Sequence, residues 1–163
     1  MTFLVLAILL QIQIGLPQRI QLENPSVAHP LARKTQKDFD KLWKRFLSGK
    51  DDSKVSRDLQ KLLRKSEEPI SLLLFQVYVD LYSGKSNDAE RELQEILSRD
   101  PSNSTALFYL ADLAYSRGDF VTATAYFQRL QSVDSSISGI EMKSQRALLL
   151  ALEALAVVRD GRR

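Results

Sequence analysis

The sequence predicts an all-α protein built from stacked helix hairpins, and two observations support this prediction. Three small residues, Val55, Ala89 and Ala123, stand 34 positions apart, and each is followed by an apolar residue four and seven positions later. A glycine precedes each of them by five or six positions. A fixed period of this length is typical of proteins in which each repeat buries the apolar face of its neighbour.

Each repeat is predicted to be two helices joined by a tight turn. Gly49, Gly84 and Gly118 interrupt the helical spacing of apolar residues, at points where a turn between helices uses a residue that tolerates positive φ. The second repeat fits this scheme only if its turn is one residue shorter than in its neighbours. The apolar residues of its first helix are then Leu74, Val77, Tyr78 and Leu81.

Polar residues predict several helix boundaries. Asn87 and Glu90 have the spacing of a capping box, and Asp119 is placed to cap the last helix of the third repeat. The pair Asp100-Pro101 is expected to end one helix and to begin the next connection.

The third repeat, residues 106–134, resembles the tetratricopeptide repeat family. It has Gly-Asp-Phe at the turn, then Ala123, the aromatic Phe127 and a closing Val-Asp. The second repeat matches from Asp88-Ala89 to Asp100-Pro101, and the first matches more loosely, with Val55 in place of the usual alanine. The resemblance implies a right-handed α-α superhelix of three repeats and a role in binding other proteins.

The chain is therefore divided into four predicted regions. These are an apolar signal-like or anchor segment (1–16), a proline-containing linker (17–35), three repeats (36–68, 69–102 and 103–137) and a C-terminal apolar helix (138–163) that is a cap or the start of a further repeat.

The N-terminal segment, residues 1–16, is apolar apart from four positions. It has the length of a signal-peptide core but lacks a preceding basic residue and an Ala-x-Ala cleavage site, and it is short for a membrane span. We expect export to the periplasm or cell envelope, or attachment to a bacterial-type membrane. If the segment is not a targeting signal, the protein is cytoplasmic.

The C-terminal stretch 147–158 is apolar at every position except Glu153. Such a helix is expected to be buried on more than one side. Either the chain is the N-terminal part of a longer bacterial repeat protein, or this helix packs against another protein, including a second copy, or it is an unusually apolar cap.

Catalysis is not expected. The 163 residues include no cysteine and one histidine, His29, which rules out thiolate sites and leaves no set of residues for a triad plus a metal site. No cofactor or metal is therefore predicted.

The family's geometry instead implies a binding surface on the concave side, formed by the first helix of each repeat. Its expected residues are Lys44, Leu47, Phe75, Val79, Tyr82, Phe108, Asp112 and Tyr115. The four aromatic members would anchor a protein or peptide. In the alternative interpretation, Phe75 and Phe108 belong to the core.

Charge suggests a second function. Residues 33–65 carry 12 basic and 5 acidic side chains, a net of +7, and residues 66–134 carry 5 basic and 11 acidic ones, a net of −6. A basic first hairpin beside an apolar N-terminus could bind an anionic membrane or nucleic acid. Aspartates interleave with these basic residues, as on a solvated helix face, so a protein partner is the preferred prediction and nucleic acid is not expected.

Overall fold

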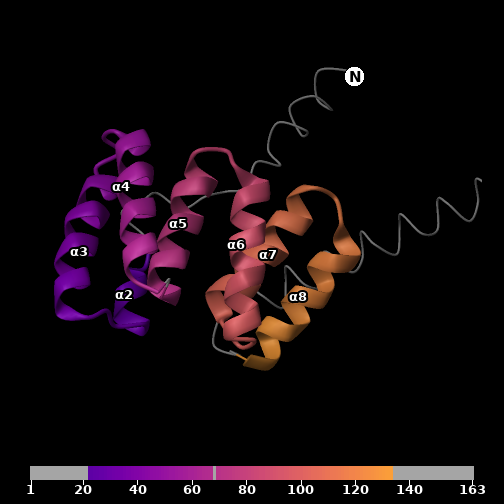
Figure 1. The fold of residues 1–163 in the computed structure, drawn as a ribbon. Coiled ribbons are helices and arrows are strands. Elements are labelled where there is room, and N and C mark those ends of the chain that lie inside the picture. Colours follow the sequence, from indigo (N-terminus) through magenta and orange to yellow (C-terminus); the bar gives the residue numbers. More distant parts are fainter. Residues whose placement is uncertain (1–21, 68, 134–163) are drawn as a thin grey trace, which may run out of the picture. The chain divides into compact units, whose positions relative to one another are not determined.

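The computed structural model describes residues 22–67 and 69–133, and every regular element in these ranges is a helix. The helices are α2 (Pro25–Ala28), α3 (Arg33–Leu47), α4 (Asp52–Lys65), α5 (Ile70–Tyr82), α6 (Ser86–Arg99), α7 (Ser104–Ser116) and α8 (Phe120–Val133) (Figure 1). They belong to two compact units, one with α2 to α6 and the other with α7 and α8. The predicted all-α fold of tandem helical hairpins is confirmed for these ranges.

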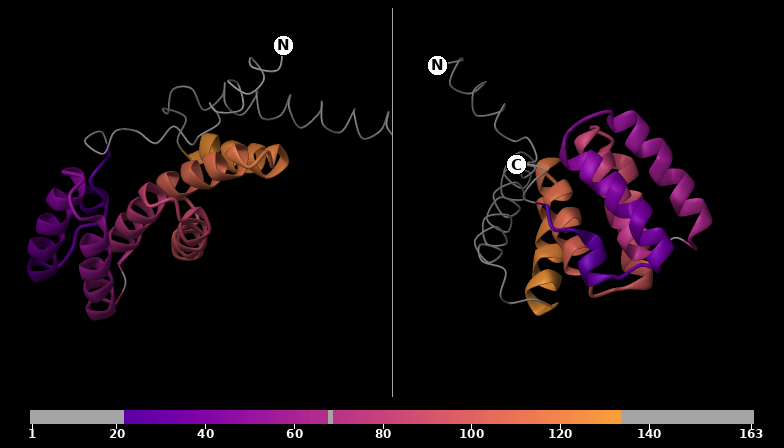
Figure 2. Two further views of the ribbon diagram at one scale, coloured as in Figure 1. Left: turned by 90° about the horizontal axis from the view of Figure 1, so that it is seen from above. Right: turned by 90° about the vertical axis from the view of Figure 1, so that its left-hand side faces the viewer.

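Helix α5 is the centre of the first unit. It packs against α2, α3, α4 and α6, and the helices of this unit lie side by side in Figures 1 and 2. Every residue from Ser71 to Leu81 is consequently buried. The sequence explains this burial, because α5 is apolar around most of its circumference, whereas α3, α4 and α6 each bury one apolar face and expose a charged one.

Glycines shape the turns that close the second and third hairpins. Gly84 and Gly118 adopt φ values of 73° and 78°, in the left-handed region that glycine occupies without steric cost. A Cβ added at either position would meet nothing within 4 Å. The backbone conformation, and not crowding, therefore accounts for glycine at these two turns.

The turn lengths correct one expectation about repeat register. Three residues connect α5 to α6 and three connect α7 to α8, whereas four connect α3 to α4. The second turn is thus one residue shorter than the first but equal to the third. Matching backbone hydrogen bonds, from Lys85 N to Asp80 O at 2.8 Å and from Asp119 N to Ala114 O at 3.0 Å, make Asp80 the counterpart of Ala114.

The predicted helix caps are partly confirmed. The Asp119 carboxylate accepts a 3.2 Å hydrogen bond from the backbone NH of Thr122. A hydrogen bond from the Thr122 side chain, together with this backbone bond, lowers the pKa of Asp119. The prediction for Asn87 is wrong. Helix α6 begins at Ser86, and Lys85 stands at its N-cap position without a side-chain capping bond.

The segment predicted as a linker, 17–35, contains a short helix. The Asn24 side chain accepts a 3.0 Å bond from the NH of Ser26 and starts α2, and the Gln36 amide of α3 donates a 2.9 Å bond to the Ser26 hydroxyl. Helix α2 packs against α5. A helix of four residues is too short to produce a periodic apolar pattern, so it was not predicted.

The second unit is a hairpin of α7 and α8. Ala123, Phe127 and Leu130 form the buried face of α8, and Ala123 has no exposed surface. The predicted N-terminal segment (1–16) and the predicted C-terminal helix (138–163, with its apolar stretch 147–158) lie outside the described residues. No helix within the described ranges is long and apolar enough to cross a membrane.

Candidate functional site

Phe75, predicted to line a concave surface, is a core residue. Its side chain has no exposed surface, and its ring contacts three aromatic rings of α3. The ring centroids lie 5.2 Å from Phe39, 5.0 Å from Trp43 and 5.5 Å from Phe46, each in an edge-on arrangement. Aromatic contacts of this geometry stabilise beyond the area that they bury. The structure therefore supports the alternative interpretation for Phe75, that it serves packing.

Val79 is buried as well, with 1% of its surface exposed. The third predicted residue on α5, Tyr82, is partly exposed, and its ring packs edge-on against Phe46 at 5.6 Å. On α3, Lys44 is exposed and Leu47 partly exposed. Of the five predicted residues in the first unit, three are thus accessible and two are not.

Helix α7 presents its predicted residues to the surface. Phe108, Asp112 and Tyr115 are each partly exposed. The residues between them, 109–111 and 113–114, are all buried. Spacings of four and three residues place the three side chains on one face of the helix. We name these three residues the α7 stripe. It joins two aromatic side chains and a carboxylate on a single rigid element.

Aromatic neighbours fix both ends of the α7 stripe. The ring of Phe108 lies edge-on to Tyr109, with centroids 5.4 Å apart, and that of Tyr115 lies edge-on to Phe120 at 5.4 Å. Rings held in this way lose little conformational freedom when a ligand covers them. The stripe belongs to the second unit, whereas Lys44, Leu47 and Tyr82 belong to the first.

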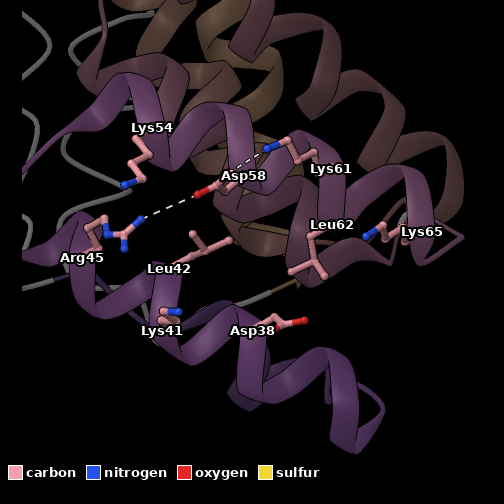
Figure 3. Close-up of a pocket in the computed structure, with 9 residues that line it drawn as sticks. All are labelled: Asp38, Lys41, Leu42, Arg45, Lys54, Asp58, Lys61, Leu62 and Lys65. Atoms are coloured by element: carbon pink, nitrogen blue, oxygen red, sulfur yellow. Dashed lines mark hydrogen bonds and ion pairs between the residues drawn. The ribbon is translucent and has the colours of Figure 1, made fainter.

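A basic groove lies between α3 and α4, and the predicted binding face did not include it (Figure 3). Its volume is about 400 Å³, and it is lined by Asp38, Lys41, Leu42, Arg45, Lys54, Asp58, Lys61, Leu62 and Lys65. The net charge of +7 in residues 33–65 was the available signal. The charge count alone did not show which of these basic residues share a groove.

Asp58 organises the cations on one side of this groove. Its carboxylate lies 3.2 Å from the Lys61 ammonium and 3.7 Å from the Arg45 guanidinium. The hydrogen bond from Lys61, with further attraction from Arg45 and Lys54, lowers the pKa of Asp58. Asp58 thus stays ionised and links the two helices across the groove.

The first unit also contains buried polar groups, in the C-terminal half of α5 and on the neighbouring helix α6. The Gln76 amide donates a 2.8 Å hydrogen bond to the Asp80 carboxylate, which also lies 3.8 Å from the Lys85 ammonium. One carboxylate oxygen of Glu92 on α6 is buried without a hydrogen-bond partner. Burial, with repulsion from Asp80, raises the pKa of Glu92 to about 8. Among the described residues, no group of acidic or histidine side chains has the arrangement of a metal site.

Comparisons with known proteins agree with the hairpin architecture. Residues 76–137 match the model of the tetratricopeptide repeat family. The structure is similar to the crystal structure of PcrH from Pseudomonas aeruginosa, with a TM-score of 0.58 and 16% sequence identity, over 80% of this chain and 98% of that chain. At this identity the likeness concerns the fold. No curated protein matches the sequence.

Proposed function

We propose that this chain, whose residues 76–137 match the tetratricopeptide repeat family, is a non-enzymatic scaffold whose α7 stripe holds a protein or peptide partner. The observation that carries the proposal is the partial exposure of Phe108, Asp112 and Tyr115 on one face of a helix whose other faces are buried. Aromatic side chains set in a rigid surface are common anchors of protein interfaces.

The chemistry of the stripe suggests what the partner offers. Phe108 and Tyr115 are seven residues apart, which is about 10 Å along the helix axis. A partner segment can place one apolar side chain against each ring. Asp112 lies between these two residues in the stripe and is its one acidic member.

Substitution within the stripe tests this function. Phe108→Ala combined with Tyr115→Ala should reduce capture of the partner by about tenfold or more, because hot-spot aromatic residues contribute most of the affinity of an interface. Capture is measured by quantitative affinity purification from the source cells. Gln128→Ala, at an exposed position of α8, is the matched control. Equal sets of captured proteins for the wild type and the double variant, both with native circular dichroism, would rule the stripe out.

The location of the scaffold is a separate proposal, which rests on the composition of residues 1–16. We expect this apolar segment to direct export or to hold the protein at a membrane. Fractionation of cells that express the full chain with a C-terminal tag tests this proposal. Recovery in the cytosolic fraction, at the mass of the full chain, would contradict it.

Self-association is proposed for the apolar stretch 147–158, since a helix with leucines on all sides needs a cover. Leu149→Glu combined with Leu152→Lys should shift the particle toward the monomer in light scattering while its helicity is retained. A wild-type chain that is already monomeric at high micromolar concentration would contradict this proposal.

A further inference from the structure

We propose that the basic groove between α3 and α4 binds an acidic peptide segment of another protein. This site lies in the first unit and is independent of the α7 stripe. Its floor is formed by Leu42 and Leu62, which are 7% and 8% exposed, and its walls are formed by charged side chains from both helices (Figure 3).

The charge of the groove is not balanced from within. Five cationic and two anionic side chains line it. Of the two acidic residues that line the groove, Asp58 alone makes ion pairs, and its partners are Arg45 and Lys61. Within residues 22–67 and 69–133, Lys41, Lys54 and Lys65 make no ion pair.

Some cations of the groove are spaced so that they repel one another along their helix. Lys61 and Lys65 are four residues apart on α4, and Lys41 and Arg45 are four residues apart on α3. Like charges at this spacing destabilise a helix. Carboxylates of a bound segment would relieve the repulsion on both helices at the same time.

The dimensions of the groove fit a short peptide. From Lys54 to Lys65, helix α4 extends about 16 Å, a length that about five residues of extended chain cover. An apolar side chain at the middle of the segment would meet the leucine floor. Carboxylates on either side of it would then face the lysines of the walls.

Charge argues that the occupant is another molecule. The 52 positions outside the described ranges contribute six basic and five acidic residues, and no two acidic residues within the N- or C-terminal part are adjacent or separated by a single residue. Neither terminal part therefore supplies an acidic segment for the groove.

Phosphate-rich ligands fit the groove less well. Asp38 and Asp58 lie among the cations, and their carboxylates would repel the backbone of a nucleic acid. A membrane surface is flat and would meet the rims of the groove but not its floor. A peptide can place its carboxylates beside the lysines and leave Asp58 with its present partners.

Binding of a defined peptide tests the proposal. The probe is a short fluorescein-labelled peptide in which glutamates flank one leucine, and the matched peptide has glutamine at every glutamate. Fluorescence anisotropy with the full chain should show binding of the glutamate peptide, weaker binding at higher salt and at least about tenfold weaker binding of the glutamine peptide. Absence of measurable binding of the glutamate peptide would overturn the proposal.

Two double variants locate the bound peptide. Lys41→Glu combined with Lys54→Glu removes one unpaired cation from each wall, and it should weaken binding by about tenfold or more. Lys37→Glu combined with Lys50→Glu makes the same charge change at exposed positions that do not line the groove, and it should weaken binding by no more than about threefold. Equal losses in the two variants would show a diffuse electrostatic attraction and would overturn the site.

Competition and sedimentation experiments test three other occupants of the groove: a membrane, a nucleic acid and a second copy of this chain. Vesicles that contain phosphatidylglycerol, and duplex DNA, should displace the peptide only weakly at equal charge concentration. Displacement by either that is stronger than displacement by unlabelled peptide would overturn the peptide as ligand. Sedimentation tests a second copy as the occupant. If the full chain dimerises and the Lys41→Glu and Lys54→Glu variant does not, a second copy fills the groove and the proposal is overturned.

Discussion

Gln76 donates a hydrogen bond to Asp80 one turn further along α5, and both side chains are buried. In the third repeat the corresponding positions are the apolar Leu110 and Ala114, as the equal length of the two turns shows. The second repeat thus has a polar pair where the third has apolar packing.

Removal of one member of this pair should cost more stability than replacement of both. Asp80→Ala leaves the Gln76 amide without its acceptor, and we expect it to lower the free energy of unfolding by about 1–3 kcal/mol. Gln76→Leu combined with Asp80→Ala should recover much of this loss, because no buried donor remains. Urea denaturation of the two variants measures the difference. A double variant less stable than Asp80→Ala would contradict this account.

Glu92 should make stability fall as pH rises. Its pKa is raised from 4.5 to about 8 by burial and by the neighbouring carboxylates of Asp80 and Asp88, so the folded state binds more protons than the unfolded state between these values. The free energy of unfolding should therefore decrease from about pH 5 to about pH 8. Glu92→Gln should flatten this part of the curve. A melting temperature of the wild type that is constant over this interval would contradict the prediction.

Gly84→Ala should destabilise through backbone strain alone. The residue has a φ of 73° and open space around the position of a Cβ, so an alanine there would cost about 1–2 kcal/mol. Gly84→Asn is the control, since asparagine tolerates the left-handed region better and should cost less. Thermal denaturation ranks the three proteins, and equal stability of the wild type and Gly84→Ala would show that the turn can relax.

Ala123→Leu should destabilise the second unit by overpacking. Ala123 has no exposed surface, and extra methylene groups in a packed site cost about 1–3 kcal/mol. Ala125→Leu, at an exposed position of α8, makes the same change without this effect. Urea denaturation should separate the two variants, and a wild-type midpoint for Ala123→Leu would mean that the site has room.

Phe75→Ala should act as a core substitution and not as a change of surface. It removes a ring that contacts Phe39, Trp43 and Phe46, and the expected loss is about 3–5 kcal/mol. Lys44→Ala, which the sequence placed on the same concave face, should leave the free energy of unfolding nearly unchanged because Lys44 is exposed. If Phe75→Ala changed the free energy of unfolding only slightly, Phe75 would not be a core residue, and its assignment to the binding surface would stand.

The hairpins could be predicted because their signals are local. The 34-residue period of Val55, Ala89 and Ala123, with a glycine before each, locates the turns without knowledge of the tertiary structure. The place of Phe75 of α5 in the core could not be predicted in the same way. Since the helix is apolar nearly all round, its sequence contains no stripe that distinguishes Phe75 from a surface residue.

The groove was hidden for a different reason. The net charge of residues 33–65 was visible, but which cations meet depends on the rotation of α3 against α4, and a count of charges does not contain that angle. On α7 the reverse holds. The residues beside Phe108 and Tyr115 are buried and leave one face partly exposed, and the binding role that the family's geometry implies for this face stays a prediction.

The enclosure of α5 also affects how this protein tolerates sequence drift. Most helices of a small protein have a solvent face on which substitutions accumulate at little cost, but the run from Ser71 to Leu81 has no such face. Each of these eleven positions is constrained by a neighbour, so compensating changes must arise in α2, α3, α4 or α6. Among homologues, α5 is therefore expected to vary least, and its partners to vary in concert with it.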